Sequence, residues 1–212
     1  MSAASVYARL REVGSPIVST REAAAALRVS TSSASRALRT LVDRGLAEHL
    51  RHGLWSLSEE PSDPRRLAPD VTRPYPSYVS FASALAARGA IDQIPREISL
   101  ASTGRPKRVR TSQATFVVHR LPADLFGGFE TRDGVALATA EKALFDFVYV
   151  AQASGRTRRR LPELDLPASF SRRAIDRWIH RIRSPRLRTL VAERIARALE
   201  NADYEDRLRV KR

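Results

Sequence analysis

The sequence contains no cysteine, and it lacks the patterns that mark several common classes of protein. Without cysteine there are no disulfide bonds, thiolate metal sites or cysteine nucleophiles. No run of about 18 apolar residues occurs, so the sequence predicts no helix that crosses a membrane. The opening segment, MSAASVYARLREVG, has no apolar signal core and carries an acidic residue. From it we expect a mature, cytoplasmic protein.

Positive charge is the strongest compositional signal. The 212 residues include 37 Lys+Arg against 23 Asp+Glu, which gives a net charge of +14. Such a balance favours an anionic partner, nucleic acid first. The net charge is +2 over residues 1–60, +3 over 61–150 and +9 over 151–212. The C-terminal excess indicates either a second nucleic-acid surface or a surface for an acidic protein, and the sequence does not separate the two.

Proline divides the chain. Residues 59–76, EEPSDPRRLAPDVTRPYP, contain five prolines, a density that argues against a helix or a central strand. We therefore expect an extended linker over residues 61–76, between a first domain at 1–60 and a second at 77–212. A second break falls at 154–167, where the arginine-rich run 156–160, including Arg158, Arg159 and Arg160, predicts a mobile linker.

Three short helices are predicted in the first sixty residues. Val6, Leu10 and Val13 have helical spacing, and Gly14 ends that helix. Ser19 or Thr20 caps a second helix over 21–28. Ser30 caps a third helix over 31–44, which Gly45 ends.

The third helix has two chemically distinct faces. Its apolar stripe follows the i, i+3, i+4, i+7 rule and consists of Ala34, Ala37, Leu38, Leu41 and Val42. The opposite face carries Ser32, Ser33, Arg36, Arg39 and Thr40. Small hydroxyl residues at a helix start let that turn enter a major groove, and arginine pairs with guanine or phosphate. This face is typical of a recognition helix, although an isolated face of this kind is usually just solvated.

Two strands follow the third helix. LAEHL and LWSL flank Arg51-His52-Gly53, which predicts a hairpin with a basic tip at Arg51 and His52. Three helices and then a hairpin is the order of a winged helix-turn-helix. DNA binding is the favoured function of such a domain, but winged helices also dock proteins.

The second half mixes strands and helices, so the predicted fold class is α+β. Ser80 is expected to cap a helix that Gly89 ends, and strands are expected at 98–102 and 114–121. Thr139 is expected to cap a long apolar helix. Two basic amphipathic helices are expected at 171–182 and 185–201. Trp178, Ile179, Ile182, Leu187, Leu190, Val191, Ile195 and Leu199 would be their buried side.

Three segments of this half carry a family resemblance. YPSYVSFASALAARGAIDQIP, FVVHRLP and GVALATAEKALFDFVYV resemble, in that order, the C-terminal domain of the AbiEi family of antitoxins. Family members place a winged helix-turn-helix before this domain, and the same order is expected here over residues 3–153. The tail, 154–212, is similar only in its helical, basic character.

The resemblance implies a specific function. Such antitoxins bind inverted repeats upstream of their own operon and repress it. They also counteract a nucleotidyltransferase-like toxin encoded next to them. The family is described as type IV, in which toxin and antitoxin need not form a stable complex. The alternatives are a solo winged-helix transcriptional regulator without a toxin and an RNA-interacting protein.

No catalytic motif is present in the sequence, and we expect no enzyme, cofactor or metal. H-E-x-x-H, G-x-S-x-G and a phosphate loop are all missing. Glu141, Lys142 and Asp146 come nearest to a catalytic set. However, a helix dipole favours an acid at the position of Glu141, and Lys142 and Asp146 predict an ordinary i, i+4 ion pair worth a few tenths of a kcal/mol.

A second cluster of cations lies in GRPKRVR, which is expected to be a loop between strands. It consists of Arg105, Lys107, Arg108 and Arg110. The cluster is either a solvated surface or a set of additional phosphate contacts, and these alternatives are about equally supported.

Overall fold

Helices and strands alternate along the chain in the computed structural model, which describes residues 2–57, 63–155 and 161–209, with side chains as far as residue 202. The expected α+β class is confirmed. The chain divides into two compact units. Unit 1 comprises residues 1–70 and 110–114, and unit 2 comprises residues 71–109 and 115–212. The arginines at 158–160, expected to form a linker, lie outside the described residues.

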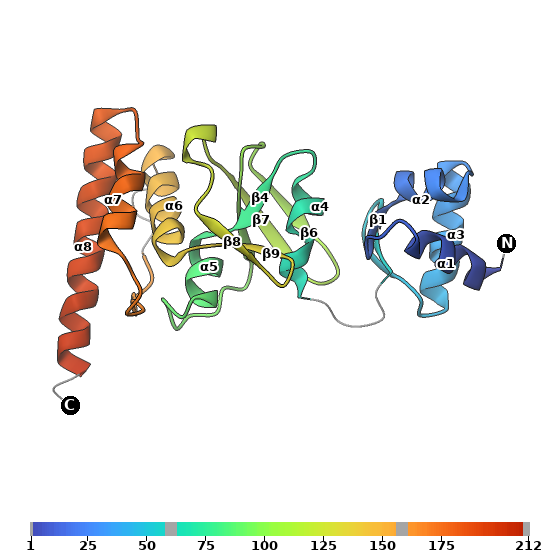
Figure 1. The fold of residues 1–212 in the computed structure, drawn as a ribbon, viewed down its shortest axis with the longest axis horizontal. Coiled ribbons are helices and arrows are strands. Elements are labelled where there is room, and N and C mark those ends of the chain that lie inside the picture. The colour runs from blue at the N-terminus through green and yellow to red at the C-terminus, as the bar shows by residue number, and fades with distance from the viewer. Residues whose placement is uncertain (1, 58–62, 156–160, 210–212) are drawn as a thin grey trace. The chain divides into compact units, whose positions relative to one another are not determined.

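The described part of unit 1 up to residue 57 contains three helices and a three-stranded antiparallel sheet of order β1-β3-β2 (Figure 1). Its elements are α1 (Ala3–Arg11), β1 (Ile17–Ser19), α2 (Thr20–Leu27), α3 (Thr31–Asp43), β2 (Glu48–Arg51) and β3 (Leu54–Ser56). The expected helices and hairpin are present. Strand β1 was not expected, because three residues are too few to show an alternating pattern.

Side-chain caps fix the ends of α2 and α3. Ser19 and Glu22 form a capping box at the start of α2, each side chain accepting a hydrogen bond from the other's backbone N–H. Arg28 ends α2 in the left-handed region, with a φ of 55°. Ser30 then caps α3 by accepting from the Ser33 N–H at 3.2 Å. Only Arg28 and Val29 therefore lie between the end of α2 and Ser30, the N-cap of α3.

The core of unit 1 forms where the three helices meet the sheet. Leu10 of α1, Leu27 of α2 and Leu38 of α3 are buried in one cluster with Trp55 of β3. Val13 was expected on the buried face of the first helix, but it is 44% exposed because α1 already ends at Arg11.

Unit 2 is built on a six-stranded mixed sheet of order β6-β7-β5-β4-β9-β8. The strands are β4 (Ser77–Val79), β5 (Ile98–Ser102), β6 (Lys107–Arg110), β7 (Thr115–Arg120), β8 (Phe129–Arg132) and β9 (Val135–Ala138). Neighbours β5 and β7 are parallel, as are β4 and β9, whereas β4–β5 and β8–β9 are antiparallel. Strands β5 and β7 were expected within one residue.

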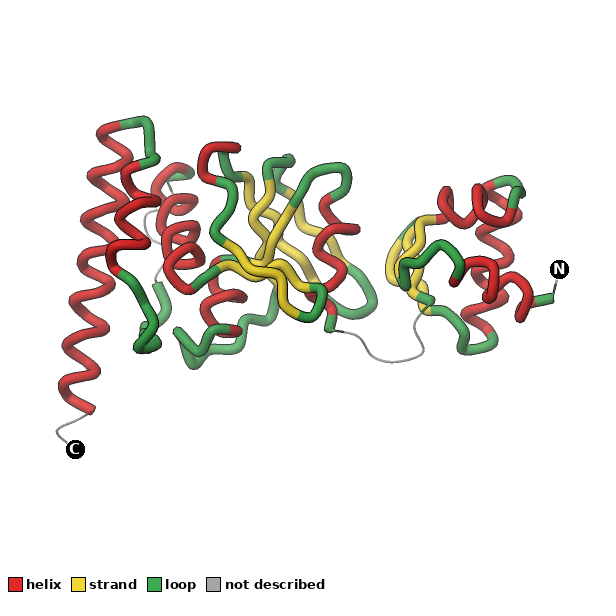
Figure 2. The backbone as a smooth tube through the Cα atoms, viewed as in Figure 1, coloured by secondary structure: helices red, strands yellow, loops and turns green. Residues whose placement is uncertain are grey.

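The helices of unit 2 form layers against this sheet. They are α5 (Phe81–Ala87), α6 (Ala140–Ala153), α7 (Arg172–His180) and α8 (Pro185–Arg209), with a 3-10 turn η2 at Ala123–Leu125. Helices α5 and α6 pack together, and α6 lies between the sheet and the α7–α8 pair (Figure 1). Residues 161–171 lead into α7 without regular structure (Figure 2). No helix among the described residues is both long and apolar enough to cross a membrane.

The expectation of an extended, helix-free linker over 61–76 is wrong for its middle part. Pro64–Leu67 form a 3-10 turn, η1, and Ala68–Thr72 form α4. Pro64 begins η1 and Pro69 lies in the first turn of α4, where a backbone N–H has no intrahelical acceptor and its loss costs nothing. Leu67 and Val71 are buried, which stabilises these short helices. Residues 61 and 62 lie outside the described part of the chain.

Three smaller expectations also need correction. GRPKRVR is not all loop, because Lys107–Arg110 form the edge strand β6. Leu190 is 41% exposed rather than buried. Ser80 stands at the N-cap of α5 but makes no side-chain cap, because its hydroxyl donates instead to Asp146.

Asp146 is the centre of a fully buried polar cluster in unit 2. Its Oδ2 accepts from the hydroxyls of Tyr78, at 2.9 Å, and Ser80, at 2.7 Å, and its Oδ1 accepts from the ammonium of Lys142. All four side chains are buried. The expected Lys142–Asp146 pair exists, but it is a buried network rather than an ordinary helix pair. Aromatic rings surround Lys142, whose Nζ lies 4.6 Å from the ring centroid of Trp178.

Burial changes the acid–base behaviour of this cluster. It lowers the pKa of Lys142 and raises that of Asp146, while their mutual attraction opposes both shifts. Burial also raises the pKa of Tyr78, as does the adjacent carboxylate. The phenol therefore stays protonated and remains a hydrogen-bond donor to Asp146.

Removing either charge should destabilise unit 2 strongly. Asp146→Ala or Lys142→Ala leaves the other ion buried without its partner, and we expect a loss of about 3–5 kcal/mol in the free energy of unfolding. The measurement is urea denaturation followed by Trp178 fluorescence in a Trp55→Phe background, which leaves one tryptophan, in unit 2.

The control is the exposed i, i+4 pair Glu193–Arg197, at 3.9 Å on α8. Glu193→Ala should cost less than about 0.5 kcal/mol. If Asp146→Ala cost as little as Glu193→Ala, the cluster would not be the buried network that the structure describes.

Candidate nucleic-acid interface

The outer face of α3 presents most of the residues that the sequence predicted for DNA. Ser32, Arg36, Arg39 and Thr40 are exposed, and Ser33 is half-buried. The opposite side of the helix is anchored by Ala34, Leu38 and Leu41, which are fully buried. The apolar stripe therefore sets which residues face outward, as expected from the helical period.

Hydrogen bonds within α3 divide these polar residues into two groups. Ser33 accepts from the Arg36 guanidinium at 3.4 Å, and the Thr40 hydroxyl donates to the Arg36 carbonyl at 3.1 Å. These hydroxyls are thus already engaged within the helix. Arg39 has no hydrogen bond or ion pair with any described residue, which leaves its guanidinium open to an external acceptor.

Part of the predicted set meets in one cleft of about 960 Å³ within unit 1. Ser32 and Arg39 of α3 line it together with His52 of the hairpin turn. Ser33, Arg36 and Thr40 do not line this cleft, and neither does Arg51, which is half-buried at the end of β2. The structure therefore brings the start of α3 and the hairpin turn to one concave surface.

The hairpin is fixed to the start of α2. Trp55 Nε1 donates to Thr20 Oγ1 at 2.9 Å, and the Thr20 N–H donates to the Gly53 carbonyl at 3.0 Å. The ring centroids of His49 and Trp55 lie 4.3 Å apart. Gly53 makes the turn with a φ of 74°, in the region that favours glycine. These contacts hold His52 in a defined position relative to α2.

Sequence reasoning missed several residues of this cleft. Arg21, Thr31, Ser35 and His49 also line it. Arg21 is exposed in the first turn of α2, and His49 is on the exposed face of β2. The alternating pattern of β2 could have indicated that His49 faces outward. That Arg21 of α2 lines the same cleft depends on tertiary packing, which the sequence does not show.

The second predicted cluster lies on and just before β6, the edge strand of the six-stranded sheet. Lys107, Arg108 and Arg110 are exposed on β6, and Arg105 is exposed just before it. Arg108 forms an ion pair with Glu97, which neutralises part of the positive charge. Charged side chains on an edge strand also oppose unwanted strand pairing. The cluster therefore has a structural explanation besides phosphate contact.

The catalytic alternative among Glu141, Lys142 and Asp146 does not form an open site. Glu141 turns away from the buried pair, and its carboxylate accepts from the Ser171 N–H at 2.8 Å. Lys142 and Asp146 are fully buried, so a substrate cannot reach them in this conformation. His119 packs against Phe81, with ring centroids 4.4 Å apart. These residues are built into the packing of unit 2.

No protein-family model matches the chain, and a comparison with curated proteins also finds no match. The resemblance to the AbiEi family therefore depends on the three sequence segments alone.

The exposed arginines of α3 should contribute little to folding. In Arg36→Ala/Arg39→Ala, we expect the free energy of unfolding of unit 1 to change by less than about 0.5 kcal/mol per substitution, since both side chains are exposed. Thermal denaturation followed by circular dichroism measures this. Leu38→Ala, on the buried face, should cost about 2–5 kcal/mol. A large loss in the double-arginine variant would mean that this face packs against something within the fold.

Proposed function

We propose that this chain is a DNA-binding antitoxin that represses its own operon and counteracts a nucleotidyltransferase-like toxin. Residues 1–60 would be the winged helix-turn-helix, with α3 as recognition helix and the β2–β3 hairpin as wing. Ser32, Ser33, Arg36, Arg39 and Thr40 would face the major groove, and Arg51 and His52 would contact the backbone at the wing. Duplex DNA with inverted repeats is the proposed nucleic-acid partner.

One observation carries the DNA-binding part of this proposal. Ser32 and Arg39 of α3 line the same cleft as His52 of the hairpin turn. The opposite face of α3 is buried in the core of unit 1. The element order α1-β1-α2-α3-β2-β3 and the three-residue connection between α2 and α3 agree with a winged helix-turn-helix. The positive end of the α3 helix dipole adds a favourable environment for phosphate oxygens.

The antitoxin part is supported by the order of the segments. SFASALAARG supplies α5, and ATAEKALFDFVY supplies the end of β9 and most of α6. Together they contain Ser80 and the Lys142–Asp146 pair of the buried cluster. The segments that resemble the AbiEi family thus contain residues of the buried cluster that joins β4, α5 and α6. This supports a fold shared with that family.

Operator binding should depend on the two exposed arginines of α3. We expect Arg36→Ala/Arg39→Ala to weaken binding to the promoter DNA upstream of the gene at least about 100-fold, because each arginine that pairs with a base contributes about 1–3 kcal/mol. A gel-shift titration at several salt concentrations measures the affinity. The wild-type affinity should fall steeply with salt, and the variant should show a shallower dependence.

The matched control removes two other exposed arginines of unit 1. Arg11 lies at the end of α1 and Arg44 is the C-cap of α3, and neither lines the cleft. Arg11→Ala/Arg44→Ala lowers the net charge equally but should leave most of the affinity. If the two double variants lost equal DNA affinity, the effect of Arg36 and Arg39 would be explained by net charge and not by a recognition helix. Unchanged affinity in Arg36→Ala/Arg39→Ala would overturn its assignment.

Toxin neutralisation should not require operator binding. We expect both the wild type and Arg36→Ala/Arg39→Ala to restore growth when expressed, from an unrelated promoter, with the product of the adjacent gene. The assay measures growth with the adjacent gene alone and with each form of this chain. If the adjacent product is toxic and neither form restores growth, while the wild type still binds its promoter, the antitoxin proposal fails.

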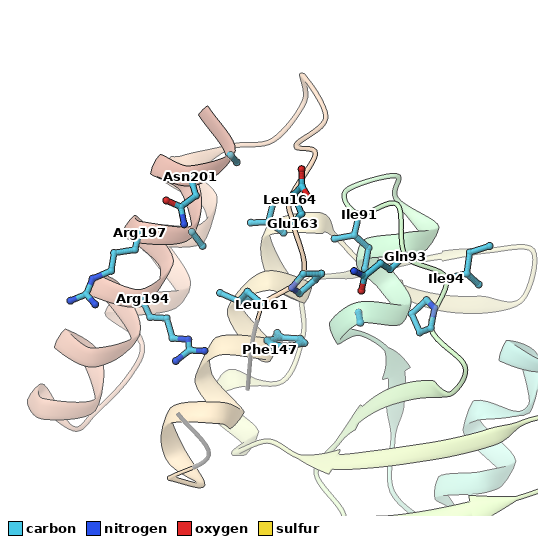
Figure 3. A pocket seen from close by; sticks show the side chains of 15 residues that line it. Ile91, Gln93, Ile94, Phe147, Leu161, Glu163, Leu164, Arg194, Arg197 and Asn201 are labelled. Atoms are coloured by element: carbon cyan, nitrogen blue, oxygen red, sulfur yellow. The ribbon is translucent and has the colours of Figure 1, made fainter. Parts of the chain in front are cut away.

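The second candidate is a solo transcriptional regulator in which unit 2 senses a ligand. The observation that favours it is a cavity of about 930 Å³ in unit 2, between α8, the segment 91–95 and residues 161–164 (Figure 3). The growth experiment separates the candidates, because a solo regulator has no toxin to counteract.

A further inference from the structure

Strand β8 is an outer strand of the six-stranded sheet, and within the described part of the chain it pairs only with β9. All four of its residues, Phe129–Arg132, are exposed. Proteins commonly protect such an edge with proline, with charge or with a covering segment. The other outer strand, β6, has three cations, Lys107, Arg108 and Arg110, which would repel a second β6. Strand β8 instead carries one acid and one base, and it contains no proline.

The outward backbone groups of β8 follow from its pairing with β9. The Thr139 N–H donates to the Gly128 carbonyl at 3.0 Å, so the backbone of Gly128 faces β9. Along an antiparallel strand, residues that share hydrogen bonds with the neighbour alternate with residues that do not. The N–H and C=O groups of Phe129 and Thr131 therefore face the open edge. They make no hydrogen bond with any described residue, so they can pair with another strand.

A second copy of β8 fits this edge in an antiparallel register centred on Thr131. The two Thr131 residues would exchange both backbone hydrogen bonds, and Glu130 of each copy would lie opposite Arg132 of the other. In such a position, between two hydrogen-bonded pairs, the side chains are close enough for opposite charges to attract. A register centred on Glu130 or on Arg132 would put like charges opposite each other. Of these three registers, only the one centred on Thr131 satisfies both the hydrogen bonds and the charges.

The charged side chains of β8 are accessible to a second copy. Arg88, at 3.2 Å, and Arg132, at 3.4 Å, both contact Oε2 of Glu130, and Oε1 makes no hydrogen bond or ion pair with any described residue. The side chains of Glu130 and Arg132 are 51% and 69% exposed. Phe129 is also exposed, and in this register it would lie diagonally across from Thr131 of the other copy, within reach of an aromatic ring. Pairing would thus add two ion pairs and cover part of an exposed aromatic side chain.

We propose that this chain forms a two-fold dimer through antiparallel pairing of β8 with β8 of a second copy. The patch is self-complementary, as the interface of a two-fold dimer must be. Four residues on each side make a small interface, so the dimer should dissociate on dilution. A two-fold dimer would also suit an operator with inverted repeats. That consequence rests on the proposed function, whereas the association itself is measured without DNA.

The test is sedimentation equilibrium of the full-length chain, without DNA, over a series of protein concentrations. We expect monomers at low concentration and dimers at high concentration. Thr131→Pro should abolish the dimer, because it removes an outward N–H from the centre of the pair. Since this N–H makes no bond within the sheet, proline is tolerated at such an edge position and the fold should be retained. Circular dichroism of the variant verifies the fold.

Charge variants test the register. Arg132→Glu gives a strand with two acids and Glu130→Arg a strand with two bases, so each alone should dimerise at least about tenfold more weakly than the wild type. A mixture of the two, with one chain fluorescently labelled, should form a heterodimer, because each acid again lies opposite a base. Arg105→Glu, just before β6, makes the same change in net charge as Arg132→Glu. It should dimerise as the wild type does and should not form the heterodimer with Glu130→Arg.

Four outcomes would overturn the proposal. The first is a wild-type chain that stays monomeric at high concentration. The second is a dimer that Thr131→Pro leaves intact, which would place the interface elsewhere. The third is equal weakening by Arg132→Glu and Arg105→Glu, which would indicate a general dependence on net charge. The fourth is a mixture of Arg132→Glu and Glu130→Arg that stays monomeric, which would exclude the register centred on Thr131.

Discussion

The buried carboxylate of Asp146 joins three elements of unit 2 in one hydrogen-bond network. It accepts from Tyr78 on β4, from Ser80 at the turn into α5, and from Lys142 on its own helix, α6. A buried charge is tolerated only when its lone pairs are satisfied, so these donors must keep their places. The Ser80 bond also holds the turn at Phe81, a non-glycine residue with a φ of 57°. Sheet, α5 and α6 are thereby fixed relative to one another.

The same cluster positions the C-terminal helices. Lys142 lies beneath the indole of Trp178 on α7, and the guanidinium of Arg181 lies 4.3 Å from the ring centroid of that indole. A Cβ on Gly128 would come within 2.7 Å of Trp178, and the φ of 72° at this residue also favours glycine. Only glycine allows the indole so close to Lys142. The packing of α7 therefore depends on an ion pair in α6.

The sequence predicted those elements that have a strong local signal. The apolar period of α3, the caps Ser19 and Ser30 and the long apolar α6 all placed helices within a residue or so of the structure. The short strands β1 and β4 were missed because three residues show no period. The helices at 64–72 were missed because every proline in this segment was treated as a helix breaker. Pro64 and Pro69 in fact lie at helix starts, where proline is tolerated. The residues of the α3 cleft were partly predicted, since helical period determines the face of Arg39 but not the approach of Arg21 or His49.

The burial of Lys142 could have been predicted from the rarity of lysine in the chain together with the position of this lysine in the sequence. Lysine is rare in this chain, at three of the 37 basic residues, yet the one fully buried cation among the described side chains is a lysine. An ammonium is compact and can sit among the rings of Tyr78, Phe145 and Trp178 while one carboxylate neutralises it. A guanidinium is planar, larger and has five donors to satisfy, so it suits exposed positions such as Arg36 and Arg39. In an arginine-rich chain, a lysine within an apolar helix and four residues before an aspartate therefore marks an interior position, and the arginines mark the surface.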